Sequence, residues 1–283
     1  MIAITGATGH LGQLTIHALL DLGTPAADIV ALVRDPQKAT DLSARGVQVR
    51  RADYTQPETL GPALQGVDKL LLISSNDVAD RATPQRHVVE AAKAAGVKLL
   101  AYTSILGAAT DKMRLAADHQ TTEADIRASG VPFVFLRNGW YLENYNVAQA
   151  AQFGALPGSA GEGRVSAASR ADYAAAAAAV LTLPDQDNTV YELGGDQAFT
   201  LGELAAEVQA ASGRPVAYQN MGEAAYAELL RGFGVPAPLA EKLADADTHL
   251  EKGELYTDSG DLSKLIGRPT TPMKQWVNQT LKS

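Results

Sequence analysis

The sequence contains no cysteine, which excludes disulfide bridges, zinc–thiolate sites, iron–sulfur clusters and a thiol nucleophile. Long hydrophobic runs are also missing, because no apolar stretch approaches the roughly 18 residues that a membrane span requires. Basic residues are in the minority, with 24 lysines and arginines against 32 acidic residues and a net charge of −8. Because nucleic-acid-binding faces are basic, we expect no nucleic-acid partner, and the short apolar runs predict no membrane partner.

The remaining composition is that of a globular protein, with 46% hydrophobic and 20% charged residues over 283 positions. This length suits one large domain, or one domain with a smaller lobe. The first residues already have a strand pattern and lack the basic start of a signal peptide. Together with the absence of cysteine, this start predicts a cytoplasmic protein.

Short apolar runs alternate with helical patterns along the first half of the chain. The runs that predict strands are Met1–Thr5, Ile29–Val33, Val47–Arg51, Leu70–Ser74, Leu99–Thr103 and Phe133–Arg137. Predicted helices between them include Gln13–Leu22, Pro57–Leu64 and Thr83–Ala95. Apolar strands separated by helices are typical of a parallel sheet covered on both faces. We therefore predict a doubly wound α/β Rossmann domain over 1–138, joined by later elements around 165–195, with 139–283 as a smaller, interleaved α/β lobe.

Three glycines spaced three residues apart, Gly6, Gly9 and Gly12, separate the first predicted strand from the first helix. Gly6 would permit a tight turn, Gly9 the close approach of a pyrophosphate, and Gly12 the packing of the helix on the strand. Such a loop directs backbone N–H groups and a helix N-terminus at one spot, which attracts phosphate. The candidate cofactor-binding residues of the loop are Gly6, Ala7, Thr8, Gly9, His10 and Leu11.

The end of the second predicted strand indicates which dinucleotide would bind. Enzymes that bind NAD have an acidic residue there for the ribose 2′-hydroxyl, whereas this strand ends in Arg34, with Lys38 one helical turn later. A guanidinium suits a 2′-phosphate, so we predict NADP (NADPH) as the cofactor. The neighbouring Asp35 would cap the next helix.

Two further strand ends open on the carboxyl edge of the sheet, where ligands bind in such folds. Asp53 would reach the adenine amine, and Ser74, Ser75 and Asn76 the ribose and phosphates. For Arg34, an ordinary solvated surface position remains the alternative.

The usual catalytic dyad of short-chain dehydrogenases, Tyr-x-x-x-Lys, is absent, because none of the nine tyrosines has a lysine four residues later. No Gly-x-Ser-x-Gly elbow or His-Glu-x-x-His motif replaces it, so neither acyl transfer nor metal-assisted hydrolysis is predicted, and we expect no metal site.

Segments along the whole chain resemble the NmrA-like branch of atypical short-chain dehydrogenases. They are ITGATGHLG, LVRDP, ADYTQPETL, LLLISSNDV, AAGVKLLAYTS, LRNGWYLENY, SRADYAAAAA and LSKLIGRPTTP. Within this family the chain is most similar to the bacterial NADPH-dependent quinone oxidoreductases of type 2, with the triphenylmethane reductases as near relatives. The resemblance implies a Rossmann domain, a small C-terminal domain, and a cleft that holds nicotinamide and substrate. It also implies dinucleotide contacts from the LRNGWY segment, here Arg137, Asn138, Gly139, Trp140 and Tyr141.

The candidate catalytic residues are His119, Tyr141 and Asn144. His119 stands four residues before Glu123, where related branches have a lysine. The segment that contains Tyr141 and Asn144 combines amides with aromatic rings, which suits stacking on a planar substrate; for Trp140 and Tyr141, a core position is the alternative. Without a strong proton donor, hydride transfer favours quinone-like acceptors, since a hydroquinone anion takes its proton from water.

Three other functions remain open at this point. An NADP-binding redox sensor or regulator without turnover also suits the missing dyad, and a triphenylmethane-dye or azo-type reductase suits the planar acceptor. A sugar-nucleotide epimerase is disfavoured by the missing dyad. The sequence leaves the oligomeric state open, a homo-oligomer included.

Overall fold

The computed structural model describes residues 1–75, 80–110 and 112–282. The chain divides into two compact units. The first consists of Met1–Ile105, Asp118–Arg137 and Arg170–Tyr191, and the second of Leu106–Ala117, Asn138–Ser169 and Glu192–Ser283. The division into the two domains proposed from the sequence stays a prediction.

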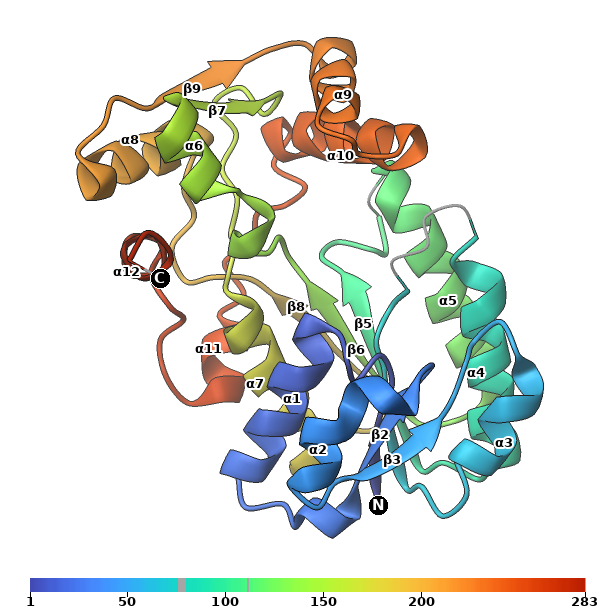
Figure 1. The fold of residues 1–283 in the computed structure, drawn as a ribbon. Helices are drawn as coiled ribbons and strands as arrows, with labels where there is room; N and C mark the ends of the chain where they lie inside the picture. The colour runs from blue at the N-terminus through green and yellow to red at the C-terminus, as the bar shows by residue number, and fades with distance from the viewer. Residues whose placement is uncertain (76–79, 111, 283) are drawn as a thin grey trace. The chain divides into compact units, whose positions relative to one another are not determined.

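A seven-stranded sheet forms the centre of the first unit and has the order β3-β2-β1-β4-β5-β6-β8 (Figure 1). The strands are β1 (Ile2–Ile4), β2 (Ile29–Val33), β3 (Gln48–Arg51), β4 (Lys69–Leu72), β5 (Leu99–Ile105), β6 (Phe133–Asn138) and β8 (Thr189–Leu193). The pairings of β1 with β2 and β4, of β2 with β3, and of β4 with β5 are all parallel. The order reverses at β1, which is the switch point where doubly wound sheets bind ligands. The predicted fold class is confirmed.

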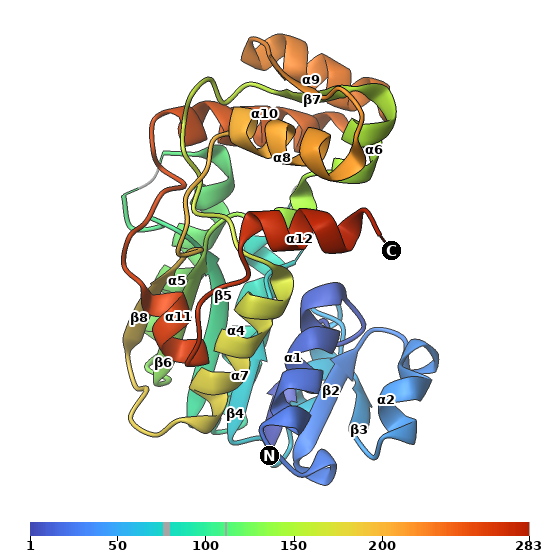
Figure 2. The same ribbon diagram turned by 90° about the vertical axis from the view of Figure 1, so that its left-hand side faces the viewer.

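Helices cover both faces of this sheet, with α1 and α7 on one face and α3, α4 and α5 on the other (Figures 1 and 2). Their bounds are α1 (His10–Asp21), α2 (Thr40–Ala44), α3 (Leu60–Ala63), α4 (Ala82–Ala94), α5 (Arg114–Ser129) and α7 (Arg170–Thr182), with 3₁₀ turns at Ala26–Asp28, Pro36–Ala39 and Pro57–Thr59. The alanines of α7 are almost all buried, and their small side chains let α7 pack closely on α1. Asp172 is buried in the first turn of α7.

The strands predicted from the sequence agree with the structure, but two predicted helices differ from it. Helix α1 begins at His10 rather than at Gln13, because the glycine loop itself winds into the first turn with Gly9 as the N-cap. The predicted Pro57–Leu64 helix is a 3₁₀ turn followed by the short helix α3.

The second unit has a smaller sheet than the first. It has the two parallel strands β7 (Ala155–Gly158) and β9 (Ala217–Asn220). Its helices are α6 (Val147–Phe153), α8 (Leu201–Ser212), α9 (Glu223–Gly232), α10 (Ala237–Glu251), α11 (Asp261–Ile266) and α12 (Met273–Thr280), with a 3₁₀ turn at Leu142–Asn144. Helix α8 begins with a complete capping box between Thr200 and Glu203, which satisfies two helix-end donors.

Candidate active site

The loop between β1 and α1 is shaped by what glycine permits. Gly6 has a φ of 57°, a backbone conformation that favours glycine. Gly9 is extended, and its N–H donates to the Gly6 carbonyl at 2.9 Å. A Cβ on Gly9 would lie 3.2 Å from that same carbonyl oxygen. Gly9 is therefore needed for space rather than for an unusual φ.

Gly12 brings the first turn of α1 against the loop. A Cβ on Gly12 would lie 2.4 Å from the Gly6 carbonyl oxygen and 2.8 Å from the Ala7 Cα, so no other residue fits. Ala7 and Leu11 are buried beneath the loop, whereas Gly6, Gly9 and His10 are exposed. The loop thus presents bare backbone and the N-terminus of a twelve-residue helix to solvent, which fits the pyrophosphate of a dinucleotide.

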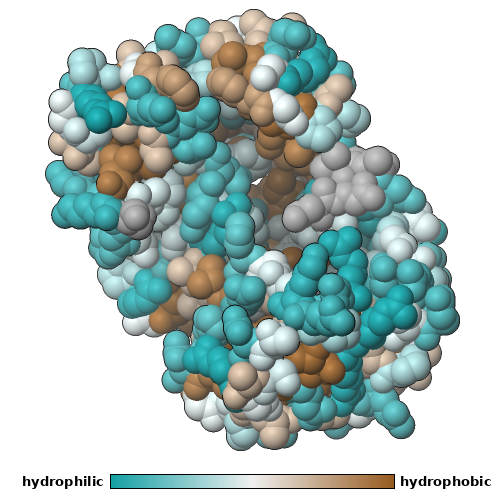
Figure 3. Space-filling model, in the orientation of Figure 1, coloured by the Kyte–Doolittle hydropathy of each residue, from teal (hydrophilic) through white to brown (hydrophobic). Residues whose placement is uncertain are grey.

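Exposed basic side chains follow the next strand. Arg34 directly follows β2, and Lys38 lies in the 3₁₀ turn after it; both are exposed. Asp35 accepts a hydrogen bond from the Gln37 N–H at 3.0 Å, so it caps this turn as expected. Figure 3 shows that the visible face of the first unit is largely hydrophilic, with hydrophobic residues in small separate patches. The two cations remain accessible to a 2′-phosphate.

The end of β3 adds a second arginine that the sequence analysis missed. Burial raises the pKa of Asp53, but hydrogen bonds from Thr55 and the charges of Arg34 and Arg51 outweigh it, and the net result is a lowered pKa. Arg51 donates to the Gln56 side chain at 2.8 Å. Both guanidinium groups therefore act on the same carboxylate, which indicates a positive potential at this edge of the sheet. Contact of Asp53 with adenine stays a prediction.

Hydrogen bonds from neighbouring side chains hold the end of β4. The N–H of Ser74 donates to Thr103 Oγ1 at 2.9 Å, and the N–H of Ser75 donates to Gln85 Oε1 at 3.2 Å. Asn76, the third candidate of this strand end, lies outside the described residues. Ser74 and Ser75 are half-buried, so part of each residue is accessible to a ligand, and their contact with the cofactor stays a prediction.

A buried polar network continues from Gln85. Its amide nitrogen donates to Tyr102 Oη at 3.4 Å, and Tyr102 Oη lies 2.8 Å from His119 Nδ1. The other ring nitrogen, His119 Nε2, lies 2.8 Å from Arg81 Nη1. Burial raises the pKa of Tyr102 well above its usual range, so this tyrosine stays protonated. The network joins β4, α4, β5 and α5, and it contains the predicted catalytic candidate His119.

A buried ion pair lies nearby in the same unit. Arg137 donates from Nε and Nη2 to the two oxygens of Glu123, at 2.9 and 2.7 Å. Ser104 Oγ donates to Glu123 Oε1 at 2.7 Å. Arg137 and Glu123 are 7% and 6% exposed, so this bidentate pair is almost fully desolvated. Glu123 thus engages two nitrogens of the Arg137 guanidinium. Contact of Arg137 with the cofactor stays a prediction.

The segment after β6 belongs to the second unit. Asn138 Nδ2 donates to Tyr141 Oη at 3.2 Å, while Asn138 Oδ1 is buried without a hydrogen-bond partner in the described part of the chain. The Gly139 N–H donates to the Leu193 carbonyl, and Trp140 is buried. Tyr141 is half-buried and Asn144 is exposed. The free amide oxygen of Asn138 suits a ligand N–H, as on a nicotinamide carboxamide.

A second group of titratable side chains lies within this unit and was not predicted. Asp247 is buried, and its Oδ2 accepts a hydrogen bond from the Ser159 N–H at 2.9 Å. Burial raises the pKa of Asp247 to about 6, partly offset by that hydrogen bond. Burial likewise raises the pKa of Tyr145 and of Tyr218, the latter to about 12. The Asp247 charge contributes to both tyrosine shifts.

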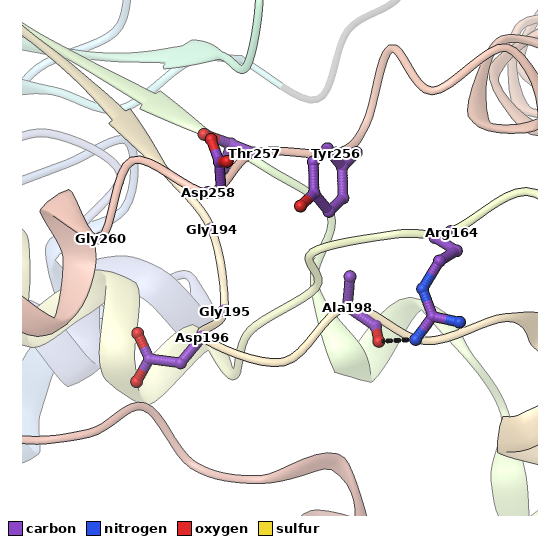
Figure 4. A pocket seen from close by; sticks show the side chains of 9 residues that line it. All are labelled: Arg164, Gly194, Gly195, Asp196, Ala198, Tyr256, Thr257, Asp258 and Gly260. Atoms are coloured by element: carbon purple, nitrogen blue, oxygen red, sulfur yellow. Dashed lines mark hydrogen bonds between the residues drawn. The ribbon is translucent and has the colours of Figure 1, made fainter.

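A polar cavity of about 450 Å³ also lies within the second unit (Figure 4). It is lined by Arg164, Gly194, Gly195, Asp196, Ala198, Tyr256, Thr257, Asp258 and Gly260. Arg164 is already engaged, since it donates to the Ala198 carbonyl and pairs with Glu203. The cavity contains none of the predicted site residues.

The described residues offer neither a metal-ligand cluster nor a membrane-spanning helix. Over residues 1–75, 80–110 and 112–282, no three or more histidine or carboxylate side chains are grouped so that they could hold a metal ion. Within the same described ranges, no helix has both the length and the apolarity to cross a bilayer.

Comparisons with known proteins agree with the geometry of the loop. A family described as NAD(P)H-binding matches residues 6–184. Quinone oxidoreductase 2 of Escherichia coli (strain K12) is 51% identical over 280 residues, which cover 98% of each protein. A crystal structure of an E. coli NADPH-dependent quinone oxidoreductase complexed with NADPH has a TM-score of 0.96 at 51% identity, covering 99% of both chains. The Citrobacter sp. triphenylmethane reductase complexed with NADP(H) has a TM-score of 0.93 at 40% identity, covering 99% of this chain and 100% of that one.

Proposed function

Because the chain belongs to the NAD(P)H-binding family, we propose that it is an NADPH-dependent oxidoreductase that transfers hydride to small quinones or similar planar acceptors. The family resemblance inferred from the sequence is confirmed. The observation that carries the proposal is the similarity to a quinone oxidoreductase over nearly the whole length of both proteins. A cysteine-free chain suits a reducing compartment, so the proposal places the enzyme in the cytoplasm.

The residues of the first unit fit the cofactor. The backbone of Gly6–Leu11 and the N-terminus of α1 would hold the pyrophosphate, and Arg34 with Lys38 would meet the 2′-phosphate. Bound NADPH would supply the hydride. Ser74 and Ser75 follow β4 on the other side of the switch point, where the second half of a dinucleotide lies in doubly wound sheets.

The chemistry fits an acceptor that needs no strong acid. Reduction of a quinone gives an aromatic anion whose delocalised charge takes a proton from water, whereas a ketone gives a localised alkoxide that needs a positioned donor. The chain has no Tyr-x-x-x-Lys dyad to supply one. The proposal assigns Tyr141 and Asn144 to binding of the acceptor and gives His119 a part in the reaction, with positioning of the reactants providing much of the rate.

The test is NADPH oxidation by the purified protein with a panel of para-quinones, dyes and ketones. We expect quinones to be reduced and ketones to react poorly or not at all. Substitution His119→Ala should slow quinone reduction about 10- to 100-fold, and Tyr141→Ala or Asn144→Ala should chiefly raise KM. Vigorous ketone reduction with little quinone activity would contradict the proposal, and tight NADPH binding with no turnover would favour the redox-sensor function.

Triphenylmethane dyes are a second acceptor class, favoured by the similarity to the Citrobacter triphenylmethane reductase. These dyes are planar cations that become neutral when they accept hydride, so they too need no proton donor. The same panel separates the two classes by the ratio of kcat/KM for a quinone and for a dye.

A further inference from the structure

The guanidinium of Arg81 is almost fully buried. The residue is 8% exposed, and its Nε has no hydrogen-bond partner in the described part of the chain. Within the same described ranges, no carboxylate forms an ion pair with Arg81. Burying an unpaired cation costs free energy that folding has to overcome. A buried guanidinium that no described carboxylate offsets is suited to bind an anionic ligand.

The contacts of Arg81 add no negative charge. A guanidinium can only donate, so His119 Nε2 accepts from Arg81 Nη1, and the ring proton lies on Nδ1. His119 then donates from Nδ1 to Tyr102 Oη, and Tyr102 stays protonated. His119 is therefore neutral in this arrangement. His119 therefore holds the Arg81 guanidinium in place without neutralising its positive charge.

Arg81 lies at the start of α4, the helix that follows β4 in the half of the sheet beyond the switch point. It is the N-cap residue of α4, a thirteen-residue helix whose N-terminal dipole adds to the positive potential. Through His119, Tyr102 and Gln85 it is connected to the Ser75 N–H at the end of β4. The phosphate loop and Arg34 lie at β1 and β2, on the other side of the switch point. An anion at Arg81 thus differs from the cofactor phosphates that those residues would bind.

We propose that Arg81, held in place by His119, donates hydrogen bonds to the acceptor oxygen that becomes negatively charged when the hydride arrives. This inference rests on the proposed function and adds a residue that stabilises the product anion. In the step, NADPH loses a hydride and becomes NADP⁺, and the quinone gains the hydride and becomes the hydroquinone monoanion. Arg81 keeps its proton throughout, and water delivers the proton that completes the hydroquinone. His119 is a positioning residue for Arg81.

Binding of 4-nitrophenol to the NADP⁺-bound protein tests the inference without turnover. Its phenolate form absorbs visible light, so binding and ionisation are read together. We expect the wild type to bind the phenolate in preference to the phenol, and Arg81→Gln to bind the phenolate about 10- to 150-fold more weakly, as expected for a hydrogen bond between charged groups. NADPH affinity should be unchanged in this variant, which separates an acceptor anion from a cofactor phosphate.

Arg86 on the same helix provides the matched control. It is half-exposed and donates to Asp125 at 2.9 Å, so Arg86→Gln should bind the phenolate like the wild type. Arg81→Lys, which keeps the charge, should restore part of the phenolate preference. His119→Gln should lose it partly while leaving NADPH affinity unchanged, as a positioning role requires.

Stability distinguishes this role from a structural one. Since no described carboxylate pairs with Arg81, Arg81→Met should cost less stability than breaking the buried Arg137–Glu123 pair, because only the neutral His119 Nε2 loses its donor. Meanwhile kcat for quinone reduction should fall with little change in KM. A clear loss of stability together with wild-type phenolate binding in Arg81→Gln would overturn the inference, as would loss of NADPH affinity alone. If the wild type binds the phenolate through Arg81 yet reduces no acceptor, the proposed function fails and the anion site stands.

Discussion

The two halves of the carboxyl edge in the first unit are built on different principles. At β1, β2 and β3 the candidate groups are exposed: bare loop backbone at Gly6 and Gly9, and the cations Arg34 and Lys38. At β4, β5 and β6 the polar groups are buried, as in the Arg81–His119–Tyr102 network and the Arg137–Glu123 pair. In the first half, the candidate ligand-binding groups are solvated in the free protein, so they reduce the free energy of unfolding little. In the second half, the groups of these two networks are part of the core, so function and stability are coupled.

Buried charges within the second half differ again from one another. Arg137 has a bidentate carboxylate partner, whereas Arg81 has a neutral histidine. Removing Glu123 would leave a buried charge without its partner, whereas removing Arg81 would leave only the neutral His119 Nε2 without its donor. The difference separates a guanidinium that holds the fold from one that is available to a ligand.

The largest effect is expected in the exposed half, at Gly9. A valine there would place its Cβ 3.2 Å from the Gly6 carbonyl and its methyl groups where the pyrophosphate would lie. Gly9→Val should therefore abolish NADPH binding, measured by calorimetric titration, with an unfolding midpoint close to that of the wild type. Gly61→Ala, where a Cβ meets nothing within 4 Å, is the control. A valine variant that titrates like the wild type would place the phosphate site elsewhere.

In the buried half, Glu123→Ala should chiefly change stability. It would leave the buried Arg137 guanidinium without its carboxylate, at a cost of about 3–5 kcal/mol in the free energy of unfolding. Urea denaturation measures the difference. The exposed Glu90 on α4 is the control, and Glu90→Ala should change stability by less than about 0.5 kcal/mol. Equal losses in the two variants would contradict the distinction between buried and exposed carboxylates.

Asp247 in the second unit is a buried carboxyl that forms no ion pair with an arginine of the described residues. Its pKa in the folded protein, about 6, is higher than in an unfolded chain, because burial disfavours the charged form. The stabilising contribution of the protonated form is therefore complete below about pH 4 and is lost as the pH rises through about 6. We expect the free energy of unfolding to fall by about 3 kcal/mol across this window.

Urea denaturation at a series of pH values measures this step, and Asp247→Asn should flatten it. The neighbouring tyrosines Tyr145, Tyr218 and Tyr226 have raised pKa values and stay neutral throughout the window. A variant with the same pH dependence as the wild type would assign the step to another group.

The smallest effect is expected at the exposed cation Arg34. Arg34→Ala should weaken NADPH binding by about 1.5–3 kcal/mol, or roughly 10- to 150-fold, through loss of a charge-assisted hydrogen bond to the 2′-phosphate. NADH affinity should barely change. Arg45→Ala removes an exposed arginine of the same unit and is the control. Equal affinities of the wild type for NADPH and NADH would contradict the assignment of Arg34.

The two halves also differ in how far they could be predicted. The loop, Arg34 and the cap at Asp35 lie within about forty consecutive residues, so local rules for strands, turns and caps suffice to find them. Helix α5 was not predicted. Its buried positions, which have helical spacing, are Leu115, Ala116, His119, Thr122, Glu123 and Ile126. Three of these six are polar, so the hydrophobic periodicity that identifies a helix is broken by the side chains that form the buried networks.

By itself, the sequence determined the strand–glycine–helix unit, the cation after the second strand, the absence of the dehydrogenase dyad, and the family. These are local patterns, and the backbone chemistry of glycine and the ends of strands is the same wherever they occur. Only the tertiary structure decided which buried charges are paired. Arg81 and His119 are 38 residues apart and Glu123 and Arg137 are 14 apart. The order of the strands brings each pair together, because desolvation and hydrogen bonding depend on distances in space that no local sequence pattern encodes.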